Sequence, residues 1–147
     1  MTLKCYDLLK DDKGYPMLLM NNCKEYSITD YNDVVNFVID HYNLRNLMEE
    51  YVCLIALDNA LHIKGIFELS HGGFDSAICG IKEVFCRLLL VGATGFILVH
   101  NHVSGNSSPS KYDIQISKKF AKASELMEFK YYDFIIIGDE VTIIIKS

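Results

Sequence analysis

Three stretches of the chain place apolar residues at the spacing of an amphipathic helix. The first runs from Asp30 to about Asn43, with Thr29 or Asp30 as its N-cap, the second spans 76–91, and the third spans 110 to about 129. In the third stretch, the side chains expected to face inward are Ile114, Ile116, Phe120, Ala123 and Leu126 or Met127. The pattern therefore predicts three helices, each packed through one apolar face.

Shorter runs rich in β-branched and aromatic residues predict strands between these helices. The strands expected are 17–20 at a sheet edge, 51–57 and 64–69 as one hairpin, 96–99, and 132–137 with 141–145 as a second hairpin. Helices that alternate with strands and hairpins favour an α/β fold, in which a mixed β-sheet is flanked by helices. A chain of 147 residues is expected to form a single domain, residues 1–147, around one core.

Composition narrows the function classes. The residues are 50% hydrophobic, which excludes a disordered chain, and the formal net charge is −5 with no basic block. Because phosphate binding depends on clustered Lys and Arg, the charge does not support nucleic acid as the main partner, although a small local patch remains possible.

Cysteine use and the absence of long apolar runs indicate the compartment. Five cysteines without a Cys-x-x-Cys pair fit reduced thiols better than a disulfide framework or a structural zinc site. The N-terminus lacks the features of a signal peptide, and no apolar run reaches the roughly 20 residues of a membrane span. We therefore expect a cytoplasmic protein that does not enter a membrane.

Candidate chemistry is concentrated between Val99 and Asp113. His100 and His102 end an apolar strand, and because side chains two apart share one face of a strand, both imidazoles can face one ion while Asn101 points away. A turn-rich loop then leads to Ser110, and the helix that follows places Asp113 in its first turn.

Two nitrogen ligands and one oxygen ligand suit catalytic zinc, whose fourth position stays open for water. Each part of the pattern also has a simpler interpretation. Ser110 and Asp113 can form only a helix capping box, and His100 and His102 can merely bond loop carbonyls. An iron(II) oxygenase uses the same ligand types, but its usual order of His, carboxylate and distant His differs from the order here.

The spacing resembles a known motif. His100-x-His102, seven further residues and Ser110-x-x-Asp113 match the JAMM metalloprotease motif of zinc-dependent deubiquitinating enzymes and their prokaryotic relatives. The segment 100–105 with Pro109 resembles the RadC family, the bacterial JAMM branch long labelled as DNA repair proteins. The stretches 57–58, 82–85 and 135–138 agree as well, so the resemblance covers about residues 50–147, with 1–49 as an N-terminal extension.

The resemblance implies a cytidine-deaminase-like α/β fold with one Zn²⁺ held by His100, His102 and Asp113. It also implies that Ser110 stabilises the oxyanion of the tetrahedral intermediate. The family's general base is a glutamate at the head of a strand, which matches Glu50, with Glu49 as its close competitor. The function implied is zinc-dependent hydrolysis of an amide bond in a peptide or protein substrate.

The chain also departs from the family pattern. Val103 stands where the family usually has proline, and Phe134 and Gly80 stand where it usually has histidine. We expect Phe134 and Gly80 to lie at the cleft, where they would affect substrate preference. We expect no counterpart of the helix-hairpin-helix segment of longer RadC proteins, which would remove the simplest route to DNA binding. The alternative function is a metal-stabilised, non-catalytic binding module in a DNA repair or mobile-element pathway.

Overall fold

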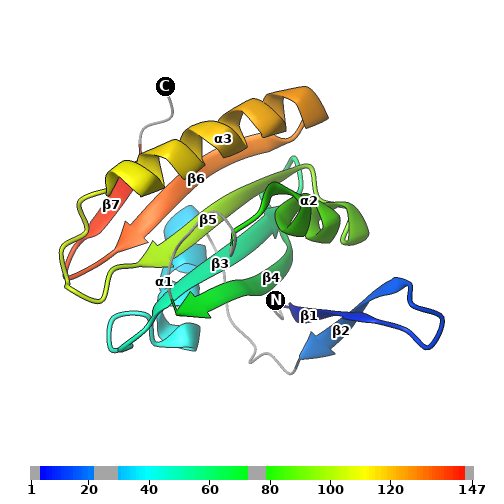
Figure 1. Cartoon of the computed structure of the whole chain (residues 1–147), viewed down its shortest axis with the longest axis horizontal. Helices are drawn as coiled ribbons and strands as arrows, with labels where there is room; N and C mark the ends of the chain where they lie inside the picture. The colour runs from blue at the N-terminus through cyan, green and yellow to red at the C-terminus, as the bar shows by residue number, and fades with distance from the viewer. Residues whose placement is uncertain (1–3, 22–29, 73–78, 145–147) are drawn as a thin grey trace.

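The computed structural model describes residues 4–21, 30–72 and 79–144. Within these ranges the strands are β1 (Cys5–Lys10), β2 (Pro16–Asn21), β3 (Glu50–Leu57), β4 (Ile63–Gly72), β5 (Gly95–Asn101), β6 (Lys130–Ile137) and β7 (Val141–Ile144). The helices are α1 (Tyr31–Tyr42), α2 (Ile81–Leu90) and α3 (Lys111–Met127). Helices and strands alternate as the pattern predicts, which confirms the α/β class (Figure 1).

All seven described strands belong to one mixed sheet in the order β2-β1-β4-β3-β5-β6-β7. β3 pairs antiparallel with β4, and β6 with β7, which confirms both predicted hairpins. β3 is the central strand of the sheet, and β5 lies next to it, antiparallel to β3 and parallel to β6. Figure 1 shows the β1–β2 hairpin at one end of the sheet, away from β5. The end of β5 is therefore enclosed by strands on both sides.

Alternating residues of the central strands face two separate cores. In β3, Val52, Leu54 and Ala56 pack with α2 and α3, while Cys53, Ile55 and Leu57 pack with α1 on the opposite face. This is the period-two alternation of a strand buried on both faces. The sheet therefore separates α1 from α2 and α3, as Figure 1 shows. Even-numbered residues of β5 such as Phe96 and Leu98 face α2 and α3, which sets the direction of His100.

Two of the predicted helix features are wrong. The second helix begins at Ile81, because Gly80 has an extended backbone (φ −82°, ψ 151°) and is the N-cap, so residues 79–80 are not helical, contrary to the prediction; the predicted start, Ser76, lies outside the described residues. In α3, Ile116 and Phe120 are buried as predicted, but Ile114, Leu126 and Met127 are 39%, 84% and 45% exposed. The helix turns Ser117 and Ser124 inward instead. The predicted end of the last strand, Ile145, lies outside the described residues.

The cysteines differ in state. Cys53, Cys79 and Cys86 are free, as predicted, whereas Cys5 is disulfide-bonded, so the prediction of reduced thiols is wrong at Cys5. Cys5 pairs with Ile66 where β1 joins β4. Among the described helices, none has the length and apolar character needed to cross a bilayer.

Candidate metal centre

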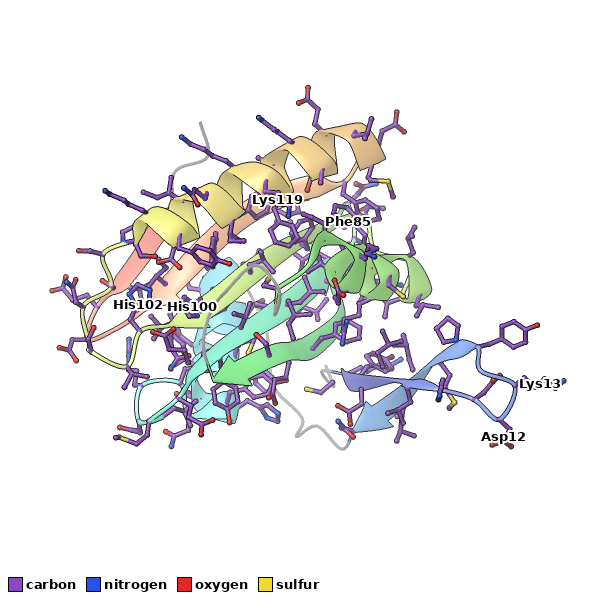
Figure 2. All side chains as sticks on the ribbon, in the orientation of Figure 1. Asp12, Lys13, Phe85, His100, His102 and Lys119 are labelled. Atoms are coloured by element: carbon purple, nitrogen blue, oxygen red, sulfur yellow. The ribbon has the colours of Figure 1, made fainter. Side chains whose placement is uncertain are left out.

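The end of β5 places His100 and His102. His100 lies on the α3 face of β5 and is 1% exposed. β5 ends at Asn101, and the His102 N–H then donates to the carbonyl of Ile137 (2.8 Å), which continues the contact with β6. Figure 2 shows both labelled histidines at this end of β5, near the first turn of α3. The backbone of both histidines is therefore held in place by β5 and its contact with β6.

Asp113 is placed by the start of α3. Ser110 is the N-cap, its hydroxyl oxygen accepts from the Asp113 N–H (3.0 Å), and Asp113 Oδ2 accepts from the Ser110 N–H (2.7 Å). These reciprocal bonds form a capping box. Ser110 and Asp113 thus form the capping box that the simpler interpretation predicted. The same capping box also holds the Asp113 carboxylate beside the histidines. The Asp113 side chain is 2% exposed.

Ligand atoms of His100, His102 and Asp113 all lie within 4.8 Å of one another. His102 Nε2 is 3.1 Å from Asp113 Oδ2, and His100 Nε2 is 3.8 Å from Asp113 Oδ1. Ligands at about 2.0 Å from a tetrahedral zinc ion stand roughly 3.3 Å apart. The separations therefore match a group that could hold a metal ion.

Hydrogen bonds fix the tautomer of each histidine. Nδ1 of His100 donates to the carbonyl of Tyr51 (2.9 Å), and Nδ1 of His102 donates to the carbonyl of Asn106 (2.8 Å), because a carbonyl can only accept. In a neutral imidazole this leaves Nε2 with its lone pair toward Asp113. Burial, which outweighs the carboxylates of Asp113 and Glu50, lowers the pKa of His100 and favours the neutral ring.

The donor set fits a cation. Nε2 of each imidazole lies 3.1–3.8 Å from the Asp113 carboxylate. Lone pairs at such distances repel one another unless a positive charge lies among them. Carbonyl partners behind the ligand histidines are the usual outer contacts of zinc sites. His100, His102 and Asp113 are therefore the residues that would hold such an ion.

A cavity of about 190 Å³ opens beside these ligands, and its walls are Glu50, His100, His102, Ser104, Ser110 and Asp113. Glu50 is the first residue of β3, and its Oε2 lies 3.7 Å from His100 Nε2. Its side chain is 33% exposed, so it reaches both the ligands and solvent. The structure thus brings all five predicted site residues to one cavity, and their chemical roles stay predictions.

Other positions singled out in the sequence lie elsewhere. Glu49 is not among the cavity walls, and its carbonyl accepts from the Asn101 side chain. Phe134 and Gly80, expected at the cleft, are not walls either. Phe134 is fully buried with its ring centroid 6.4 Å from that of His100, because its position in β6 faces the core, and Gly80 caps α2. Val103 is 41% exposed on the loop after His102.

Two contributors to the site were missed. Ser104 is a cavity wall, and only its place inside the segment 100–105 could have marked it. Asn101 points away from the histidines as predicted, but its side chain bonds the backbone at the start of β3. These two hydrogen bonds connect residues that are separated by 50 and by 52 positions in the sequence, so no local sequence pattern predicts them.

Comparison with known proteins identifies the family. The RadC-like JAB domain matches residues 28–146 of the chain. The chain belongs to the RadC family. The match begins within the segment that the sequence analysis assigned to an N-terminal extension, before α1. The mixed sheet with helices on both faces is the α/β arrangement that this membership implies.

Curated RadC relatives carry the name UPF0758. The chain is 38% identical to a UPF0758 protein of Pelobacter propionicus over 99 residues, which cover 67% of this chain and 43% of the relative. It is 31% and 33% identical to UPF0758 proteins of Caldanaerobacter subterraneus and Alkaliphilus metalliredigens over 134 residues, 91% of this chain and 57% of each relative. The chain thus spans about half the length of these relatives.

Proposed function

We propose that this chain is a zinc-dependent hydrolase that cleaves an amide bond, peptide or isopeptide, in a peptide or protein substrate. The observation that supports it is the convergence of His100, His102 and Asp113 within 4.8 Å, with the Glu50 carboxylate 3.7 Å from His100. Two imidazoles and one carboxylate leave a fourth position for water on zinc, which is the composition of hydrolytic rather than structural sites.

Each residue has a distinct task in this proposal. Bound zinc would lower the pKa of its water to about 7 and polarise the scissile carbonyl. Glu50 takes a proton from the attacking water and returns it to the departing amine, a task that needs a carboxylate with access to both the ligands and solvent. The Ser110 hydroxyl accepts from the Asp113 N–H, so its own hydrogen can point to the developing oxyanion.

Geometry favours Glu50 over Glu49 as the base. Glu50 is the first residue of β3 and is among the cavity walls, whereas Glu49 precedes the strand and is not. The two glutamates therefore form a matched pair for a test, since the same change of a carboxylate to an amide can be made at either position.

The test measures bound zinc and peptide cleavage together in the wild type and in His102→Ala, Glu50→Gln and Glu49→Gln. The substrates are a peptide library and isopeptide-linked peptides, with new termini read by mass spectrometry. His102→Ala is expected to lose both zinc and cleavage. Glu50→Gln keeps zinc and loses about 10²–10⁴-fold in rate, whereas Glu49→Gln resembles the wild type.

Two outcomes contradict the proposal. Cleavage that is equal in the wild type and Glu50→Gln would remove Glu50 as the base. A zinc-loaded wild type that cleaves neither kind of bond, while it binds a protein or DNA tightly, would refute hydrolysis and favour a metal-stabilised binding module.

A further inference from the structure

Asn101 holds both peptide groups that flank Glu50. Its Oδ1 accepts from the Tyr51 N–H (2.5 Å), and its Nδ2 donates to the Glu49 carbonyl (3.0 Å). Asn101 is 1% exposed, so both bonds are shielded from water. A single buried amide thus binds the backbone on each side of the residue that faces the ligand cluster.

The Asn101 hydrogen bonds connect β3 and β5 beyond the last backbone pair of these strands. β3 and β5 are paired from Leu57 and Gly95 to Val52 and His100, and the register goes no further. Beyond Val52, the Asn101 side chain and the bond from His100 Nδ1 to the Tyr51 carbonyl connect the two strands. On its other side β3 changes register against β4 between Val52 and Cys53. The head of β3 is therefore positioned by side chains of β5 as well as by regular sheet pairing.

The position of Glu50 depends on this segment. Its carboxylate comes from the first residue of β3, where β4 pairs with one edge of the strand and side chains of β5 hold the other edge. The residues that hold the segment, His100 and Asn101, are adjacent to or among the residues that would bind the metal. Movement of the β3 head would change the Glu50–His100 separation of 3.7 Å directly.

We propose that Asn101 is a positioning residue that sets Glu50 at the distance needed for proton transfer. The inference rests on the proposed function, because Asn101 would position Glu50, the general base of that reaction. Asn101 would contact neither substrate nor metal, since it lies on the face of β5 opposite His100. Its effect would reach the reaction only through the backbone of residues 49–51.

The first test is the variant Asn101→Ala, measured for zinc content, steady-state kinetics and amide hydrogen exchange at Tyr51. We expect one zinc per chain, an unchanged KM and a kcat lowered about 100-fold, because a displacement of about 1 Å costs roughly this much. The Tyr51 amide should be protected in the wild type and should exchange faster in the variant.

The matched control is Tyr131→Phe, which removes the buried hydrogen bond between Ser117 Oγ and Tyr131 OH (2.8 Å), away from the cavity. A general loss of stability would lower the melting temperatures of both variants. Only Asn101→Ala should lower kcat. Equal kinetic effects of the two substitutions would refute a specific role for Asn101.

The second test combines the substitutions. If Asn101 acts through Glu50, Asn101→Ala with Glu50→Gln has the same kcat as Glu50→Gln alone, because the group being positioned is already gone. Rate losses that multiply instead would refute the inference.

Failure of the inference differs from failure of the proposed function. A wild type that shows turnover, with kcat unchanged in Asn101→Ala, refutes the positioning role alone. Rapid exchange of the Tyr51 amide in the wild type also refutes it, whatever the folding of the variant. A zinc-loaded wild type with a protected Tyr51 amide and no turnover refutes the hydrolase, and the positioning role with it.

Discussion

Asp113 shows how one side chain serves folding and chemistry together. Its Oδ2 accepts from the Ser110 N–H and contacts His102, while Oδ1 faces His100. The capping box therefore fixes the rotamer of the carboxylate before any ligand binds. A buried carboxylate without such bonds would be costly, and here the helix N-terminus supplies the compensating donors.

Gly138 permits the loop that supports His102. A Cβ at Gly138 would lie 2.3 Å from the Gly105 carbonyl oxygen and 2.8 Å from the Ser107 nitrogen, so backbone would have to move. The displaced segment includes Asn106, whose carbonyl orients the His102 ring. Gly138→Ala is expected to weaken zinc binding about 10–100-fold, measured by competition with a chelating dye.

Gly14 provides the control for Gly138. It lies in the β1–β2 turn with φ +86° and open space around its Cβ position. Gly14→Ala is expected to lower stability through backbone strain and to leave zinc affinity unchanged. Equal zinc affinities in the wild type and Gly138→Ala would show that the loop does not control the His102 ring.

At the residue scale, the sequence predicts the ligands better than their supports. The His-x-His spacing on a strand and a carboxylate in a first helical turn follow from local periodicity. For Asn101, periodicity predicts which face of the strand the side chain lies on but not its hydrogen-bond partners. Its partners, at Glu49 and Tyr51, depend on the β3–β5 pairing.

The helices α1 and α3 begin in the same way. Asp30 and Asp33 form a capping box at α1, as Ser110 and Asp113 do at α3. The α1 box is exposed, whereas Ser110 and Asp113 belong to the cavity walls. A comparison of the two capping boxes therefore distinguishes what a helix cap contributes to folding from what it contributes to the site.

Ser110→Ala and Asp30→Ala are expected to destabilise the protein by similar amounts, about 1 kcal/mol each, because both remove an N-cap acceptor. Urea unfolding measures this loss. Only Ser110→Ala should also reduce peptide cleavage, since its hydroxyl is proposed to support the oxyanion. Cleavage that falls equally in both variants would assign Ser110 to capping alone.

At the element scale, helix existence is predictable and helix rotation is not. The apolar pattern predicts that α3 buries Ile114 and Leu126 or Met127, all of which are exposed. The buried stripe of α3 instead includes Asp113, Ser117 and Ser124. The Asp113 contact with the histidines, together with the packing of Ile116 and Phe120, sets the rotation of the helix. A stripe that mixes serine and aspartate with apolar residues gives a weak signal in hydrophobic periodicity.

The cavity at the candidate metal centre joins three elements, and one of them, β3, is distant in the sequence from the other two. Glu50 comes from β3, the histidines from β5 and the loop after it, and Asp113 from α3. A bound ion would therefore connect the central strands to the helix that covers one face of the sheet. Binding to the native state alone stabilises that state by mass action.

Zinc at 100 times its dissociation constant should stabilise the wild type by about 2.7 kcal/mol. For a chain of this size, that corresponds to a rise in melting temperature of roughly 5–10 °C over the chelator-treated protein. Calorimetry measures it. His102→Ala should show little or no rise, and an equal rise in both proteins would place zinc elsewhere.

At the scale of the whole molecule, the sequence predicts the class and the family but not the strand order. Both hairpins follow from local turns, and the family resemblance rests on the segment 100–113. The placement of β1 between β2 and β4, with a disulfide-bonded Cys5 at the junction, depends on contacts between distant segments. Such contacts leave no local periodicity to detect.

The contact that brings Asp113 beside the histidines also makes a step of folding visible. All three ligands lie within residues 100–113, and α3 must dock against the end of β5 before Asp113 meets the histidines. Glu50 joins them only through the pairing of β3 with β5, a contact between distant segments of the kind that forms slowly. Zinc uptake during refolding would therefore report the docking of α3 at the end of β5, without any label on the chain.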